Sequence, residues 1–252
     1  MSISSPKLKN PAAKFIEFKG DRGAFCYYDK ELEKQIEMNL PMRFIVLDQL
    51  NTIVGFNESE KSGIFSNEVH SLTDEVLSVR FFKGGTLAKG TYENIRDKVI
   101  ANGGKFCKIV YALLKGEELE LVAFKFSGAA FGAWLEFSKK VDLTSKGVQV
   151  CDEFVDGKKG SVKFKLPVFK PLVLPGEYIQ KAIEMDLELQ EYFQAYKSQQ
   201  REAISQDVEV SEVKEVKEPP KETPKETPKE TPAEEVKFGD EDDLNNGDPL
   251  PF

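Results

Sequence analysis

The sequence has little of the chemistry that enzymes place at their reaction centres. It contains one histidine, His70, three cysteines and one tryptophan among 252 residues. No serine, cysteine or threonine stands in a motif in which that histidine would activate it. Gly84-Gly85 and Gly103-Gly104 lack the Gly-Lys-Ser/Thr continuation of a phosphate-binding loop. The sequence therefore favours a binding protein over an enzyme and predicts no cofactor.

The cysteines, Cys26, Cys107 and Cys151, are far apart and odd in number. A disulfide framework requires pairs, so this pattern indicates free thiols in a reducing compartment. Together with His70 the cysteines add up to a Cys3His set. Structural zinc sites, however, bring ligands in pairs about two to four residues apart, and these residues do not have that spacing. We predict no metal site.

Long apolar runs are also missing. No run reaches the roughly 18 to 20 residues that cross a bilayer. The first residues, MSISSPKLKNPAAKF, lack the continuous apolar core of a secretory signal. We therefore expect a soluble protein without a membrane partner that stays in the cytoplasm.

The net charge of −8 is divided unevenly along the chain. From Ala203 onward there are 15 acidic residues and 6 lysines, whereas residues 1–202 hold 28 acidic and 29 basic residues. The body is therefore slightly basic and the tail strongly acidic. This asymmetry is typical of a nucleic-acid partner, of a tail that masks its own body, or of both.

The tail contains a short repeat, Lys-Glu-Thr-Pro, which occurs three times from Lys221 to Pro232. A proline at every fourth position removes a backbone donor from each helical turn, and the repeat has no large apolar side chain to bury. We therefore predict a disordered linker over residues 203–238 that carries an acidic segment, residues 239–252.

Runs rich in β-branched and aromatic residues, bounded by turn residues, recur through residues 1–175. Hairpins are predicted around Lys115 to Glu117 and around Asp156 to Gly160. Such a chain buries its strands by closing into a small barrel or a sandwich, so the predicted fold is mainly β with a few helices. Strands are predicted at about residues 14–19, 24–29, 42–56, 63–69, 76–83, 106–114, 119–127, 148–155 and 161–169.

Three helices are predicted between and after these strands. The first contains Tyr92 to Ile100, the second runs from Ala129 to Val141, and the third begins at Pro175-Gly176 and covers 176–202. The apolar seam of the third helix is too short for a coiled coil, so that helix either packs on the barrel or forms a dimer contact. This seam consists of Tyr178, Ala182, Met185, Leu189, Tyr192 and Tyr196.

Basic residues are interleaved with aromatic ones on several predicted strands. In SVKFKLPVFK, Lys163 and Lys165 share one face; in VLSVRFFKGG, Arg80 and Phe82 share the face opposite the apolar residues. Unpaired bases stack on such rings at roughly 1–3 kcal/mol each while cations follow the phosphates. The alternative is that the aromatic residues belong to the core and that the lysines and arginines are ordinary solvated surface residues. The candidate DNA-binding residues are Arg22, Phe25, Tyr27, Tyr28, Arg80, Phe82, Lys83, Lys105, Lys108, Tyr111, Lys125, Trp134, Lys158, Lys159, Lys163 and Lys165.

The last residues, GDEDDLNNGDPLPF, resemble the acidic tip of bacterial and phage single-stranded DNA-binding proteins. The insertion 244–250, which separates the acids from the end, departs from that pattern. The resemblance implies an OB-like β barrel, a disordered linker and a tip that binds partner proteins, in a bacterial or phage-infected cell. The residues that match the tip are Asp240, Glu241, Asp242, Asp243, Pro251 and Phe252.

We therefore expect residues 1–175 to form an OB-like barrel that coats single-stranded DNA in replication, recombination or repair, without strong sequence preference. The tip would recruit replication or recombination proteins, and the chain could form a homo-oligomer. Two alternatives are a mediator of single-strand annealing or recombination, and a β-barrel protein-interaction module with a solubilising acidic tail.

Overall fold

The computed structural model describes the backbone of residues 8–212 and the side chains of residues 8–198. The chain divides into two units, residues 1–204 and 205–252; among the described residues the second contains only the end of one helix. The predicted linker from residue 213 onward and the acidic tip lie outside the described residues.

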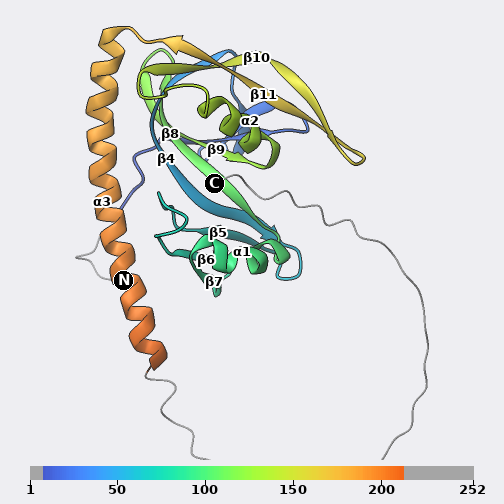
Figure 1. Ribbon diagram of the computed structural model, residues 1–252, viewed down its shortest axis with the longest axis vertical. Coiled ribbons are helices and arrows are strands. Elements are labelled where there is room, and N and C mark those ends of the chain that lie inside the picture. Colours follow the sequence, from blue (N-terminus) through green and yellow to red (C-terminus); the bar gives the residue numbers. More distant parts are fainter. Residues whose placement is uncertain (1–7, 213–252) are drawn as a thin grey trace, which may run out of the picture. The chain divides into compact units, whose positions relative to one another are not determined.

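The described part is mainly β, as predicted, with helices at the three expected places (Figure 1). The strands are β1 (Lys14–Lys19), β2 (Ala24–Asp29), β3 (Lys34–Glu37), β4 (Met42–Asn57), β5 (Ser62–Ser66), β6 (Leu77–Phe81), β7 (Thr86–Gly90), β8 (Gly104–Lys115), β9 (Leu119–Ser127), β10 (Lys146–Lys159) and β11 (Val162–Val173). The helices are α1 (Tyr92–Ala101), α2 (Gly128–Ser138) and α3 (Gly176–Glu212).

The strands form one sheet in the order β3-β2-β1-β9-β8-β4-β5-β6-β7, and β10 joins it through β4. The pairing is antiparallel except between β1 and β9, which run parallel. Within the described residues this path has two free ends, β3 and β7, so the expected closure of the sheet is not observed.

The long strands β4 and β8 are the frame of the fold, and they pair from Phe44 to Gly55 with a bulge between Val46 and Asp48. Because side chains alternate along a strand, the even-numbered residues of β8 line one face of the sheet and the odd-numbered residues line the other. Each face is covered by different elements, which decides where a surface remains free for a partner.

On the first face lies the main core, made by β1, β2, β4, β8, β9, β10 and α2. Its centre is Trp134, whose ring stacks on Phe126 at 4.9 Å and 11° and whose indole N–H donates to Gln49 at 3.0 Å. A second core on the same face lies under α1 and contains Ile53, Leu77 and Tyr92. The small sheet β5-β6-β7 is built around this second core.

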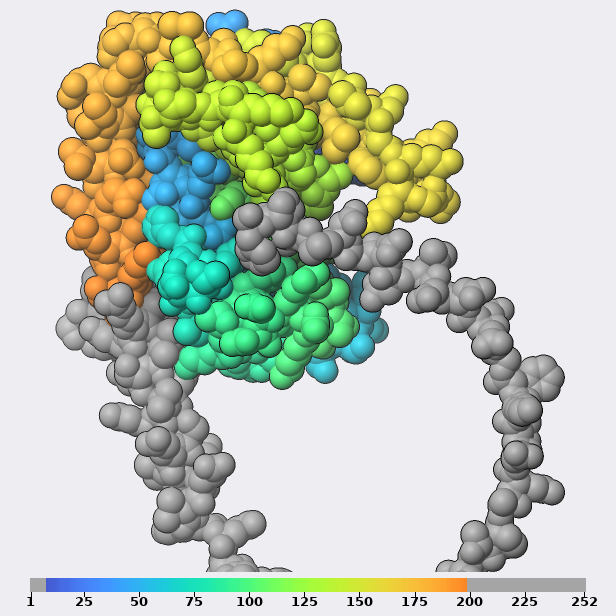
Figure 2. All heavy atoms as spheres, in the orientation of Figure 1, coloured from blue at the N-terminus to red at the C-terminus, as the bar shows by residue number. Residues whose placement is uncertain are grey.

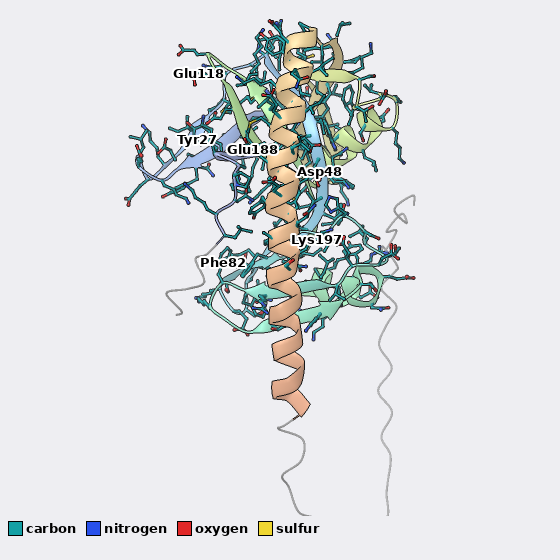
Figure 3. The ribbon with its side chains drawn as sticks, turned by 90° about the vertical axis from the view of Figure 1, so that its left-hand side faces the viewer. Tyr27, Asp48, Phe82, Glu118, Glu188 and Lys197 are labelled. Carbon is teal, nitrogen blue, oxygen red and sulfur yellow. The ribbon has the colours of Figure 1, made fainter. Side chains whose placement is uncertain are left out.

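Helix α3 covers the other face over part of its length. Ala182, Leu189 and Phe193 are buried there against odd-numbered residues of β8 and against neighbouring strands. Figure 3 shows the helix crossing in front of the sheet. α3 continues to Glu212, ten residues beyond its predicted end at residue 202, because residues 203–212 contain neither proline nor glycine.

Candidate nucleic-acid interface

Three phenylalanines are exposed on the small sheet and on the end of β4 that pairs with it. Phe56 on β4, Phe65 on β5 and Phe82 after β6 are 49%, 37% and 74% exposed. Single exposed apolar residues are ordinary, whereas a group of large ones on one face indicates an interaction site. We call these three residues the aromatic face.

The strand register places the three rings on one side of the sheet. Val54 pairs with Phe65 and Phe56 pairs with Gly63, so Phe56, Phe65 and the open position at Gly63 share a face. The ring of Phe82 fills that open position, because a Cβ on Gly63 would lie 2.4 Å from its Cδ2 atom. The rings of Phe65 and Phe82 are 4.8 Å apart between centroids and tilted by 34°.

Basic side chains lie beside the aromatic face. Arg80 pairs with Phe65 across β5 and β6, and Lys105 pairs with Val54 across β4 and β8, so both share the side of the rings. Arg80 is held by a hydrogen bond from Nε to the Ser78 hydroxyl at 3.3 Å. Lys83 follows Phe82 in the turn, where its ammonium donates to a backbone oxygen at 3.1 Å. The predicted residues Arg80, Phe82, Lys83 and Lys105 are thus brought together.

A second group of aromatic and charged residues, acidic as well as basic, lines a groove of about 1020 Å³ between the N-terminal segment and β2. It contains Tyr27, Tyr28 and Lys125, and Tyr28 is 58% exposed. The ammonium of Lys14 lies 5.3 Å from the Tyr27 ring. Tyr27 and Phe82 lie on the same side of α3, on the upper and lower parts of the sheet (Figure 3).

Three of the predicted contacts, all aromatic, lie in the interior, which is a correction, and a fourth, Lys108, is half-buried. Phe25, Tyr111 and Trp134 are at most 1% exposed, so none has a ring face free for a base. Lys108 donates to Asn51 at 2.7 Å, and burial lowers the pKa of its ammonium. For Tyr111 on β8 the alternation of apolar residues cannot reveal this burial, because both faces of that strand are covered.

The remaining predicted bases lie elsewhere. Lys158, Lys159, Lys163 and Lys165 are on the β10–β11 hairpin, and Arg22 is on the β1–β2 turn. Sequence reasoning missed Phe56 and Phe65. Phe65 follows the buried Ile64 in its strand and so falls on the opposite face, whereas Phe56 follows Gly55 and has no such signal.

The described residues hold no constellation for metal chemistry. The free cysteines Cys26, Cys107 and Cys151 are buried on β2, β8 and β10. Among the described residues no group of three or more histidine, cysteine, aspartate or glutamate side chains could hold a metal ion. None of the described helices is both long and apolar enough to cross a membrane.

A polar network lies between β4, β8 and α3. Tyr111 donates its hydroxyl to Glu68 at 2.8 Å and accepts a hydrogen bond from Asn10 at 2.7 Å. His70 Nε2 and Gln190 Nε2 each lie 2.9 Å from Asp48 Oδ2. Burial raises the pKa of the Glu68 carboxyl and of the Tyr111 hydroxyl. The network joins strands and helix α3, and the Glu68 carboxyl in it makes the stability of the fold depend on pH.

Replacing Glu68 with glutamine is expected to change the pH dependence of folding. The pKa of Glu68 is raised in the folded chain, so the unfolded chain ionises first and stability falls as pH rises above the ordinary value of 4.5. Glu68→Gln removes this loss. Urea unfolding should show the variant gaining stability relative to the native chain as pH rises above 4.5. An equal difference at all pH values would contradict the assignment.

Glu75→Gln is the matched control. Burial alone would raise the pKa of the Glu75 carboxyl, but hydrogen bonds from Lys197 and from the Ser71 and His70 amides outweigh it and lower the pKa. The sign is therefore opposite, and this variant should lose stability relative to the native chain as pH rises through the range in which Glu75 ionises.

Comparisons with known proteins give no family for this chain: no protein-family model, no curated protein and no solved structure matches it.

Proposed function

We propose that this protein binds and coats single-stranded DNA in replication, recombination or repair, without strong sequence preference. The observation that carries the proposal is the aromatic face, with three exposed phenylalanines beside Arg80 and Lys105 on one side of an antiparallel sheet. Every unpaired base has a π-face that stacks on such rings, at roughly 1–3 kcal/mol per base, whatever its identity. Arginine and lysine supply the attraction to phosphate.

We also propose that the fold is an OB-like barrel. It is supported by the main core, around which β1, β2, β9, β8, β4 and β10 are arranged with α2 against them. An OB fold is itself a partly open barrel, so free sheet ends are compatible with it. The recruitment of partner proteins by residues 239–252 rests on the resemblance of that acidic segment alone.

The test is a titration of labelled oligothymidylate followed by fluorescence anisotropy, between about 50 and 200 mM NaCl. We expect binding that weakens with salt. A logarithmic slope of about −2 is expected if Arg80, Lys83 and Lys105 each neutralise one phosphate, since single strands give roughly −0.7 per neutralised phosphate. A chain that ends at Lys237 is the control that assigns binding to the body. Absence of binding at low salt in both chains would refute the proposal.

A further inference from the structure

The end of the β10–β11 hairpin is a two-stranded ribbon that lies outside the main sheet. β10 pairs with β4 only through Val148, Gln149 and Val150; beyond a bulge, it pairs with β11 alone. The strands continue through Asp156 to Lys159, where a loop was predicted, and the turn lies at residues 160–161. We call residues 154–167 the basic arm. It projects from the body on the side away from α3 (Figure 2, yellow).

The basic arm has one strongly charged face. Lys158 pairs directly with Lys163, and Asp156 pairs with Lys165, so these four side chains lie on the same side of the ribbon. Like charges directly opposed across two strands destabilise a ribbon. Three lysines against one aspartate on a narrow strip are therefore a cost to the fold that a ligand of opposite charge would offset.

The charged face borders a groove of about 400 Å³ against the β1–β2 turn. The amide of Lys165 donates to the carbonyl of Gly20 at 2.8 Å, and a Cβ on Gly23 would meet the Lys165 stem at 2.5 Å. Asp21 of the turn lines the groove with the lysines, and its carboxylate lies 3.8 Å from the Nε of Arg22. Three lysines and two aspartates line the groove and leave it positive.

The basic arm offers no free ring to an unpaired base. Phe154 packs on Phe18 at 5.9 Å and carries the Lys165 ammonium 5.7 Å from its centroid. Phe164 lies across Gly157, where a Cβ would be 2.3 Å from the ring. The arm can therefore contact phosphates, but it lacks the stacking surface that single-strand binding uses.

We propose that the basic arm is a second nucleic-acid contact, which binds the phosphate backbone of double-stranded DNA. A two-stranded ribbon fits the major groove of B-DNA, which is about 12 Å wide, and strand readers of duplexes use that geometry. The aromatic face then binds unpaired DNA and the basic arm binds paired DNA. This goes beyond single-strand coating and places the protein where the two kinds of DNA meet.

The competing explanation is that the lysines only protect a free edge from pairing with other chains. The two explanations differ in what happens when the charges are removed. Edge protection predicts that duplex binding stays unchanged while self-association increases, whereas the proposal predicts a loss of duplex binding.

The test compares Lys158→Gln, Lys159→Gln and Lys163→Gln, combined in the full chain, with the native chain. Lys165 is kept because its stem packs on the body. A labelled blunt duplex and labelled oligothymidylate are titrated separately by anisotropy. We expect duplex affinity to fall by about tenfold or more, with a salt slope shallower by roughly 0.9 for each phosphate that the variant no longer neutralises. Oligothymidylate affinity should change far less.

The matched control removes the same charge from three other exposed lysines, Lys98, Lys139 and Lys181, which lie on or beside the three helices. Equal weakening by the control, an equal loss of oligothymidylate binding by the arm variant, or no duplex binding by the native chain at low salt would each overturn the proposal. Duplex binding without oligothymidylate binding would support the arm and refute the single-strand function, so the two proposals fail separately.

Discussion

Replacing Phe65 and Phe82 together with alanine is expected to weaken oligothymidylate binding by about 30-fold or more. Each stacked base is worth roughly 1–3 kcal/mol, so even the lower value for two rings removes about 2 kcal/mol. Both side chains are exposed, and Phe82 is the most exposed aromatic residue of the described chain, so the fold should lose little stability. Anisotropy titration measures the affinity, and urea unfolding checks the fold.

Two further variants make this prediction specific. Val173→Ala with Leu187→Ala removes exposed apolar side chains of β11 and α3, 82% and 62% exposed, and should leave the affinity unchanged. Phe82→Trp keeps a stacking surface and should retain binding. If the double alanine variant unfolds like the native chain and binds oligothymidylate equally well, the aromatic face is not the single-strand site.

Replacing Trp134 with alanine is expected to lower the free energy of unfolding by about 3–5 kcal/mol, because a fully buried aromatic side chain leaves a cavity. The ring is 1% exposed, stacks on Phe126 and packs edge-on against Phe169 at 5.3 Å. The change also leaves the Gln49 side chain without its indole donor. Urea unfolding at neutral pH measures the loss.

Trp134→Phe serves as the comparison, since it keeps most of the ring and should lose clearly less. The Trp134→Ala variant, under conditions in which it is still folded, should bind oligothymidylate as well as the native chain does. A stability loss below about 1 kcal/mol would show that the main core does not depend on this ring, and a selective loss of binding would return Trp134 to the DNA-binding set.

Much of the local structure follows from the pattern of apolar residues. Each predicted strand range contains a strand, and β1 and β2 have the predicted bounds. The strands β3 and β7 were missed because β3 is short and mostly polar (Lys34–Glu37) and β7 has only two apolar residues, Leu87 and Ala88; each pairs with the strand just before it in sequence. The length of α3 was underestimated because the amino-acid composition becomes tail-like before the first residue that breaks a helix.

The exposure of a side chain could be predicted from the sequence only on strands that the core covers on a single face. The alternation of Leu77, Val79 and Phe81 placed Phe82 outside correctly, because the second core covers one face of β6 alone. Tyr111 lies on a strand covered on both faces, by the main core and by α3, and no local pattern encodes the second cover. The pairing of Phe65 with Arg80, and hence the aromatic face, likewise depends on register between strands.

The open position at Gly63 also affects the entropy of binding. Phe82 has most of its surface in solvent, yet its ring occupies the space that a side chain at position 63 would need. An exposed phenylalanine ordinarily samples several rotamers and loses that freedom when a ligand orders it. In this fold the contacts of the ring with Gly63 and with Phe65, 4.8 Å away between centroids, favour one position, so part of that entropy loss precedes the stacking of a base on Phe82.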